Sequence, residues 1–349
     1  MRPPFIVTTP IRNEAWILEK FLATTSLWAD HLLILDSGCT DQSLKICQRF
    51  PKVRILPFDL CYLTSEHRRR HDLFHAARQI NSQAIVFTLD ADEILSAEIL
   101  SPMIQQQLIE NLEQPGTSLA LPWIMLWKSP REYRVEPYGV WSDRTMNCVY
   151  WDDGKSDYPF EGFLHFPRVP RQFHHSQKSF DLPLLHYQFS AWKRTQLKQA
   201  HWRILEWEKG PKTVLNSIRI NLLYAIARES WDAKTTPISE QWIEGYQRHG
   251  IPLTQSFDDP SPWFISEIVP LLQQKKKESF ALLDIWDLPW EIYRQRLNPE
   301  NPALNPSRVD DPRSPIQRAY HHLIHGLSYC GSSLALRIYR FLKIKNKEK

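Results

Sequence analysis

Long hydrophobic runs are absent from this 349-residue sequence. No stretch approaches the roughly 20 apolar residues that a bilayer-spanning helix needs. The short run Phe5-Ile6-Val7 at the start lacks the length and the cleavage site of a secretory signal. Cysteine is scarce too. The five cysteines have no paired spacing, and their odd number leaves at least one unpaired. We therefore predict a cytoplasmic protein with reduced thiols.

A strong excess of one charge is also missing. The 43 Lys and Arg residues face 39 Asp and Glu residues, and the net charge is only +4. This balance does not indicate a nucleic-acid partner. The 42% hydrophobic content is enough for a substantial core, and we expect most of the fourteen tryptophans to lie in it rather than to serve as platforms for sugar rings.

Apolar runs alternate with helical patterns along the first ninety residues. The runs are Phe5–Thr9, His31–Leu35, Val53–Leu56 and Ile85–Leu89. The intervening helices are predicted through Ile17–Leu22 with Asn13 as the cap, through Leu44–Cys47, and over Glu66–Asn81. This alternation predicts an α/β fold with a mostly parallel sheet sandwiched by helices. Ligands of such sheets bind outside the carboxyl ends of the strands, where the loops after the first, second and fourth strands converge.

The fourth apolar run stops at the sequence Asp90-Ala91-Asp92-Glu93. Strand alternation sends Asp90 and Asp92 to the same side, so both carboxylates could reach one cation. Their oxygens suit Mg²⁺ or Mn²⁺, and a substrate phosphate could supply further ligands. The alternative is an acidic pair in a solvated turn.

Three motifs together resemble the N-terminal half of the family 2 glycosyltransferases, which have the GT-A fold. They are Thr9–Glu14, Asp36–Asp41 and Leu89–Glu93. The resemblance implies a nucleotide-sugar donor held by the first two loops, and a divalent metal that links its diphosphate to the Asp-x-Asp loop. Ser37 stands where many members have a second acidic residue. The donor-binding residues that follow from the resemblance are Pro10, Arg12, Glu14, Asp36, Ser37 and Asp90.

Two further cationic or metal-binding positions follow from the expected chemistry. The diphosphate leaving group gains negative charge, which a cation held by Asp92 would stabilise. Arg68 or Arg69, on the helix before the fourth strand, could donate to the same diphosphate, and we select Arg69; a solvated helix face is the alternative. Several GT-A enzymes add a C-terminal histidine to the metal ligands, so His186, at the end of an apolar run, is the third candidate ligand after Asp90 and Asp92. A structural histidine is the competing interpretation.

An inverting transfer also needs a carboxylate that takes the proton of the acceptor hydroxyl. The candidates beyond the Asp-x-Asp motif are Asp152, Asp153, Asp157, Glu161 and Asp181. We favour Glu161, because apolar neighbours would raise its pKa, and we place Asp153 second.

The chain is divided by composition into four segments. We predict a GT-A catalytic domain over 1–190, a mainly helical extension over 191–297, a Pro-rich linker over 298–315 and an amphipathic basic tail over 316–349. Residues 129–188 are expected to form short strands and long loops on the acceptor side. The tail could contact the inner membrane face peripherally, or pack on its own domain.

These observations predict a metal-dependent, inverting glycosyltransferase. It would move a sugar from a nucleotide-diphosphate donor, expected to be a UDP-sugar, to a hydroxyl group of a glycan, lipid or protein. Two alternatives remain open: a non-catalytic nucleotide- or glycan-binding module of the same fold, and a membrane-surface scaffold that uses the basic tail.

Overall fold

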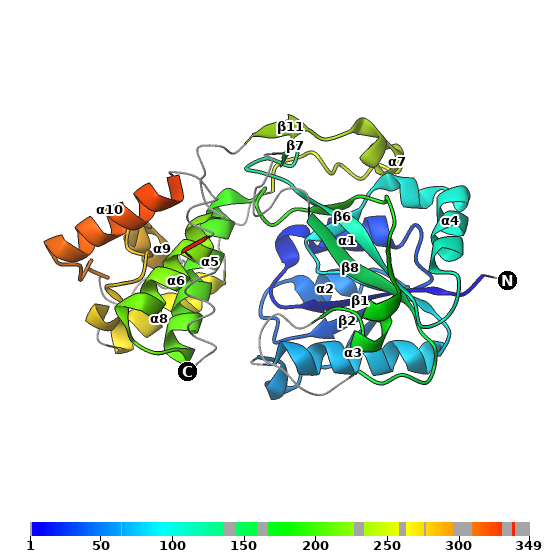
Figure 1. Cartoon of the computed structure of the whole chain (residues 1–349), viewed down its shortest axis with the longest axis horizontal. Helices are drawn as coiled ribbons and strands as arrows, with labels where there is room; N and C mark the ends of the chain where they lie inside the picture. The colour runs from blue at the N-terminus through cyan, green and yellow to red at the C-terminus, as the bar shows by residue number, and fades with distance from the viewer. Residues whose placement is uncertain are drawn as a thin grey trace. The chain divides into compact units, whose positions relative to one another are not determined.

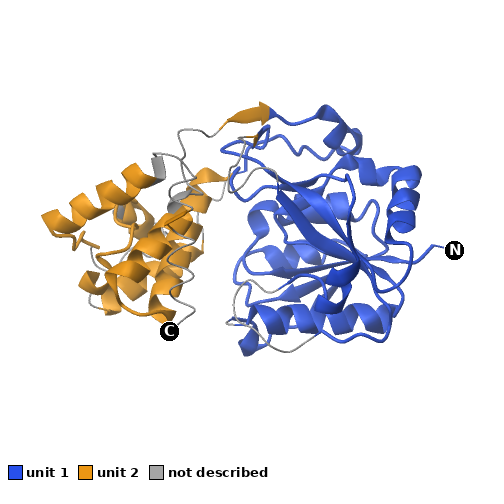
Figure 2. Cartoon of the chain, in the orientation of Figure 1, with its two compact units in different colours: residues 1–133, 143–190, 237–257 blue, residues 134–142, 191–236, 258–349 orange. Residues whose placement is uncertain are grey.

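The computed structural model describes residues 2–63, 65–135, 144–158, 167–226, 234–257, 263–275, 277–295, 309–329 and 337–338. The chain forms two compact units (Figure 2). Unit 1 contains residues 1–133, 143–190 and 237–257, and unit 2 contains residues 134–142, 191–236 and 258–349. One boundary between the units follows residue 190. Residues 237–257 return to unit 1. The predicted division into consecutive segments does not contain such a return.

Unit 1 is built on a nine-stranded sheet with the order β3-β2-β1-β4-β8-β6-β10-β5, and β9 pairs with β6 (Figure 1). The strands β1 to β4 are mutually parallel, whereas β8 runs antiparallel to both β4 and β6, and β5 antiparallel to β10. The strands are β1 (Phe5–Ile11), β2 (His31–Asp36), β3 (Val53–Leu56), β4 (Ile85–Thr88), β5 (Glu93–Leu95), β6 (Ser118–Met125), β8 (Arg144–Trp151), β9 (Gln177–Ser179) and β10 (Leu184–His186). The predicted α/β class is confirmed.

Both faces of this sheet are covered. Alternate side chains of β1 enter two different cores, Phe5 on one face and Ile6 on the other. Phe21 of α1 belongs to the first core, and Phe74 of α3 to the second. A strand that is buried on both faces reads as a continuous apolar run, which is why these strands are visible in the sequence.

The helices of unit 1 lie between the strands in the chain. The α-helices are α1 (Ala15–Thr25), α2 (Ser43–Cys47), α3 (Glu66–Ile80), α4 (Pro102–Leu112) and α7 (Glu244–Arg248), and the 3-10 helices are η1 (Leu60–Leu63), η2 (Ala97–Leu100), η3 (Arg171–Ser176) and η4 (Glu240–Trp242). The free thiols include Cys39, Cys47, Cys61 and Cys148.

Unit 2 is mainly helical, as predicted, with an apolar core of its own. Its helices are α5 (Trp192–Lys209), α6 (Val214–Ile226), α8 (Phe264–Gln274), η5 (Lys277–Phe280), α9 (Trp290–Gln295) and α10 (Pro315–Tyr329). Pro315 begins α10, a position where the missing amide proton is not needed. Outside the nine-stranded sheet of unit 1, the chain also contains the short strands β7 (Glu132–Arg134) and β11 (Thr235–Pro237).

Several predicted segments fall outside the described residues. Residues 298–308 of the expected linker and 339–349 of the basic tail are among them. Within the described part of the chain, no helix has both the length and the apolar character to cross a membrane.

Two local predictions differ from the structure. Pro10 does not end the first strand, because β1 continues to Ile11 and Pro10 aligns with Leu35 of β2. The region 129–188, expected to hold short strands and loops, contributes the eight-residue strand β8 to the interior of the sheet.

Candidate functional site

The loops after β1 and β2 are bound to each other. Asn13 has a left-handed backbone (φ 57°), and its Oδ1 accepts hydrogen bonds from the amides of Thr40 at 2.6 Å and Asp41 at 3.1 Å. The prediction that Asn13 caps the following helix is wrong. The Ala15 amide at the start of α1 donates instead to Asp41 Oδ2 at 3.1 Å, and the preceding Glu14 amide donates to Ser43 Oγ, at the start of α2, at 2.9 Å.

The second loop turns at Asp36. Its Oδ1 accepts hydrogen bonds from the amides of Gly38 at 2.9 Å and Cys39 at 2.8 Å, and Gly38 has the positive φ of 93° that glycine tolerates best. Ser37 is buried, and its hydroxyl has no hydrogen-bond partner among the described residues. In the first loop, the Glu14 carboxylate accepts a hydrogen bond from the Trp16 indole at 2.6 Å.

A closed turn follows β4 at the same edge of the sheet. The Asp90 amide donates to Glu93 Oε2 at 2.9 Å, and the Glu93 amide donates back to the Asp90 carbonyl at 3.0 Å. The Glu93 side chain is fully buried and also accepts from Trp123 Nε1 at 2.8 Å. Glu93 therefore fixes the backbone of the turn that carries both aspartates.

Two guanidinium groups converge on Asp90. Arg70 of α3 lies 2.8 Å from Asp90 Oδ1, and Arg168 lies 2.6 Å from Oδ2. Arg168 also donates to Glu93 Oε1 at 3.1 Å. Burial alone would raise the pKa of Asp90, but Arg168 and Arg70 lower it to about 2. Asp90 is therefore ionised at neutral pH.

Further positive charge lies close to this pair. Burial lowers the pKa of the Arg69 guanidinium, and neighbouring Arg70 and Arg12 lower it further, whereas Glu66 and Asp90 oppose this shift. Arg69 donates to the carbonyl oxygen of Tyr62. The predicted Arg12 and Asp90 thus each lie within electrostatic reach of the predicted Arg69, on three different segments of unit 1.

Helix α3 contains a triple-arginine run, Arg68–Arg70, whose members make different contacts. Arg68 pairs with Asp72 of its own helix at 2.9 Å. Of the three, Arg70 is the one that contacts Asp90. Neither Arg70 nor Arg168 is among the site residues predicted from the sequence. The triple-arginine run was the available signal for Arg70, whereas Arg168 stands alone in a Pro-containing segment without any pattern.

Asp92 and His186 meet beside this turn, both almost completely buried. His186 Nε2 lies 3.6 Å from Asp92 Oδ1, and the Tyr187 amide donates to the Asp92 carbonyl at 2.8 Å. The imidazole stacks on the Trp123 ring with centroids 4.7 Å apart, and its Nδ1 lies 3.2 Å from Met125 Sδ. For Nε2 to bind a metal together with Asp92, the proton must be on Nδ1, the nitrogen that faces Met125 Sδ.

These contacts determine how well the residues suit a metal ion. Asp92 and His186 fit as two protein ligands, because an oxygen and an imidazole nitrogen face each other closely. Asp90 is engaged by two guanidinium groups, and Asp90, Asp92 and His186 are not among the groups of three ligand atoms that converge in the described part of the chain. Ions such as Mg²⁺ commonly use one or two protein ligands and complete their shell with substrate phosphate and water.

Of the two favoured catalytic carboxylates, the structure describes Asp153. Glu161 falls outside the described residues. Asp153 follows β8, whose last residue, Trp151, aligns with Ile85 at the amino end of β4. The structure thus places Asp153 at the opposite edge of the sheet from Asp90, where its Oδ1 accepts from the amides of Lys155 at 2.9 Å and Ser156 at 2.8 Å.

No family profile matches this sequence, and no curated protein matches it. Among solved structures, it is similar to glucosyl-3-phosphoglycerate synthase from Mycobacterium tuberculosis in complex with Mn²⁺, UDP and glucosyl-3-phosphoglycerate, with 14% identity over 53% of this chain and 72% of that chain and a TM-score of 0.34. The same synthase with Mg²⁺ and UDP gives 20% identity, 35% and 44% coverage, and a TM-score of 0.26. A 4-diphosphocytidyl-2C-methyl-D-erythritol synthase shows 14% identity over 44% of this chain and 77% of that chain, with a TM-score of 0.27. The match to the synthase with Mg²⁺ and UDP thus spans less than half of that chain. Similarities of this size do not identify a substrate or a reaction.

Proposed function

We propose that this chain is a metal-dependent transferase that moves a sugar from a nucleotide-diphosphate donor, such as a UDP-sugar, to a hydroxyl acceptor. The observation that carries the proposal is the pair Asp92 and His186, 3.6 Å apart and buried next to an arginine-bound Asp90. Buried titratable groups that converge at the ligand-binding edge of an α/β sheet are typical of functional sites.

The donor would lie along the loops after β1, β2 and β4. Asp36 and the buried Ser37 hydroxyl are available for the nucleoside, with Pro10 and Glu14 in the adjacent loop. Hydroxyl and carboxylate groups suit the polar edges of a base and a ribose. Because the two loops are joined through Asn13, this part of the site is formed before the donor binds.

Cationic side chains would bind the diphosphate. Arg70 and Arg168 present planar guanidinium groups that match phosphate oxygens, and Arg69 and Arg12 add positive charge nearby. In the absence of donor, Asp90 and Glu93 balance this charge. The diphosphate would compete with these carboxylates for the same donors.

Asp92 and His186 would hold Mn²⁺ or Mg²⁺, which stabilises the negative charge that the departing diphosphate gains. The stacked Trp123 ring and the Met125 contact keep the His186 ring oriented toward Asp92. In the inverting reaction that we propose, the acceptor hydroxyl attacks C1 of the sugar while a carboxylate takes its proton, and Glu161 remains our candidate for this base.

A donor-hydrolysis screen tests the proposal, since transferases of this kind would be expected to hydrolyse their own donor slowly without acceptor. The wild-type chain with Mn²⁺ should release UDP from at least one UDP-sugar, and Asp92→Asn should not. Asp153→Asn is the matched control, because Asp153 lies at the other edge of the sheet. Equal release by the Asp92 and Asp153 variants would contradict the assignment.

A further inference from the structure

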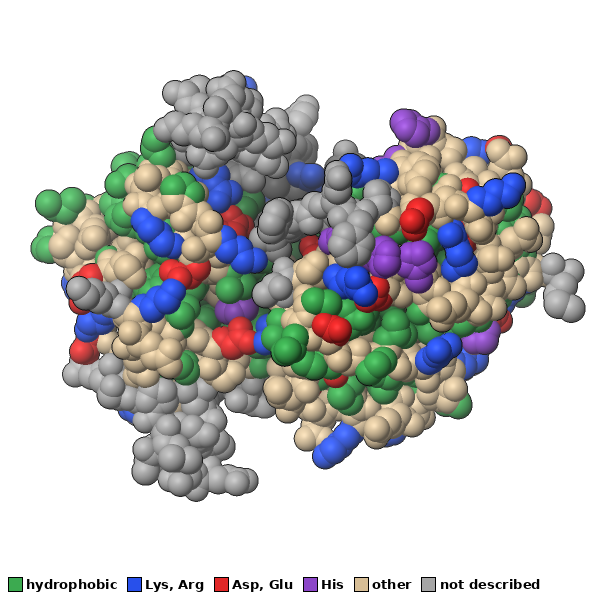
Figure 3. Space-filling view, turned by 90° about the horizontal axis from the view of Figure 1, so that it is seen from below, with side chains coloured by type: hydrophobic (Ala, Val, Ile, Leu, Met, Phe, Trp, Pro, Cys, Tyr) green, Lys and Arg blue, Asp and Glu red, His purple; other side chains and the backbone are tan. Residues whose placement is uncertain are grey.

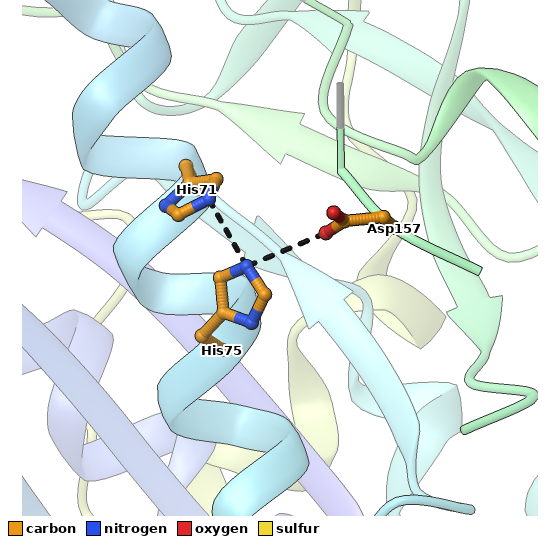
Figure 4. A group of neighbouring side chains, drawn as sticks. All are labelled: His71, His75 and Asp157. Atoms are coloured by element: carbon orange, nitrogen blue, oxygen red, sulfur yellow. Dashed lines mark hydrogen bonds and ion pairs between the residues drawn. The ribbon is translucent and has the colours of Figure 1, made fainter. Parts of the chain in front are cut away.

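A second cluster of metal-ligating side chains lies on helix α3. His71 and His75 are four residues apart and therefore project from the same side of the helix, and the loop after β8 brings Asp157 to them (Figure 4). The two Nε2 atoms are 3.0 Å apart, and His75 Nε2 lies 3.5 Å from Asp157 Oδ1. All three ligand atoms lie within 4.8 Å of one another. The cluster shares no residue with the Asp92–His186 pair.

The spacing of these atoms suits a small transition-metal ion. Tetrahedral Zn²⁺ holds nitrogen and oxygen ligands at about 2.0–2.2 Å, which puts neighbouring ligand atoms about 3.3 Å apart. The observed separations of 3.0 and 3.5 Å lie on either side of this value. We propose that His71, His75 and Asp157 bind a divalent ion of the zinc class. Imidazole ligands favour such ions over Mg²⁺, which prefers oxygen.

The surroundings of His71 support this proposal. Its Nδ1 lies 2.9 Å from Asp72 Oδ1, and Asp72 itself accepts from Arg68 Nε at 2.9 Å and from the Tyr62 hydroxyl at 2.7 Å. A carboxylate that accepts the Nδ1 proton leaves the Nε2 lone pair for the metal and fixes the ring, as in many zinc sites. Asp72 thus orients the ligand without binding the ion.

The cluster is open to solvent. The side chains of His71, His75 and Asp157 are 21%, 39% and 77% exposed. Figure 3, which views the molecule from below, shows histidine side chains gathered on one face beside acidic and basic groups. An ion can reach this position directly, and water can complete its coordination.

A bound ion would fix the loop 152–158 on α3. That loop is already attached at its start, where Arg78 of α3 donates to Asp152 at 2.6 and 2.9 Å. At its end Tyr158 is buried and the Asp157 carbonyl oxygen accepts from Gln172, but the Asp157 side chain is largely exposed and lies 3.5 Å from His75. We therefore assign the ion a structural role at the end of this loop.

The test is to titrate the chelator-treated full-length chain with Zn²⁺ in the absence of nucleotide and to measure the binding affinity. The visible absorption spectrum of the same chain with Co²⁺ in place of Zn²⁺ is recorded as a second measurement. The wild type should bind zinc, and His75→Ala and Asp157→Asn should each weaken that binding at least about tenfold. Asp157 is mostly exposed, so its variant should keep the wild-type circular dichroism spectrum and separate metal loss from misfolding.

Three control variants separate this cluster from other metal ligands. His174→Ala removes an exposed histidine of unit 1, His325→Ala disrupts the separate group of Asp284, Asp287 and His325 in unit 2, and Asp92→Asn removes a ligand of the proposed donor metal. The zinc binding that is lost in His75→Ala should persist in all three. Unchanged zinc affinity in both His75→Ala and Asp157→Asn, or no zinc binding by the wild type, would overturn the proposal.

Discussion

Helix α3 holds a carboxylate at each edge of the sheet through an arginine, and the two pairs differ in their surroundings. At the amino end of β4, Arg78 takes both oxygens of Asp152, whose side chain is only 2% exposed. At the carboxyl end, Arg70 and Arg168 share Asp90, whose side chain is 37% exposed. The first pair is complete without a ligand. In the second pair, two guanidinium groups lie beside a partly exposed carboxylate and next to the Asp92–His186 pair. A bound anion could replace this carboxylate as their partner.

The largest effect should come from Asp92. Asp92→Asn removes the negative ligand of the proposed metal while preserving the shape of the side chain. We expect donor hydrolysis to fall by about 10²–10³-fold, the loss typical when a group that stabilises transition-state charge is removed. The measurement is the initial rate of UDP release at saturating Mn²⁺. A fall of less than about threefold would remove Asp92 from the mechanism.

The next effect separates structure from function at the opposite edge. Asp152→Ala leaves the Arg78 guanidinium without its buried partner, so the free energy of unfolding should fall by about 3 kcal/mol. Urea unfolding measures this change. UDP affinity at 25 °C should stay within about twofold of wild type, because binding at the carboxyl edge does not use Asp152. Loss of affinity in a folded variant would break the contrast between the two edges.

Arg70 should affect donor binding more than stability. Arg70→Gln removes one of the two cations at Asp90, and Arg168 still balances that carboxylate. We expect the Kd for UDP to rise about tenfold, which corresponds to the loss of one charge-assisted hydrogen bond. Arg68→Gln is the matched control on the same helix, since Arg68 contacts Asp72 instead. Equal effects of the two substitutions would argue against a diphosphate contact.

The smallest effect concerns pH. The pKa of Asp90 is lowered from 3.8 to about 2, so its contribution to stability is complete above pH 3.8 and is lost as the pH falls toward 2. The stability difference between wild type and Asp90→Asn should therefore shrink over that range. It should be below about 1 kcal/mol, because the side chain is more than a third exposed. Urea midpoints at pH 5, 4 and 3 measure it. A difference that grows on acidification would contradict the sign.

The sequence revealed the elements that are buried on both faces. The strands β1, β2 and β4 are continuous apolar runs, and their order along the chain was enough to predict a parallel sheet with three loops at one edge. The helical character of unit 2 was likewise visible from periodicity.

Contacts that depend on long-range register were not visible. Asp92 and His186 meet because β5 pairs antiparallel with β10, where His186 aligns with Glu93. Arg168 reaches Asp90 across 78 positions of sequence from a segment without periodicity. Asn13 lost its expected capping role because its left-handed backbone directs it to the second loop. The return of residues 237–257 to unit 1 has no compositional signal.

The most direct test of the donor site is isothermal titration of UDP into the full-length chain with Mn²⁺ and with EDTA. Our account predicts that wild type binds UDP more tightly with Mn²⁺ than with EDTA. It also predicts that this difference disappears in Asp92→Asn and remains in Asp152→Asn, whose position lies at the other edge of the sheet. UDP binding that is unaffected by Mn²⁺ in the wild type, or that stays Mn²⁺-dependent in Asp92→Asn, would contradict the account.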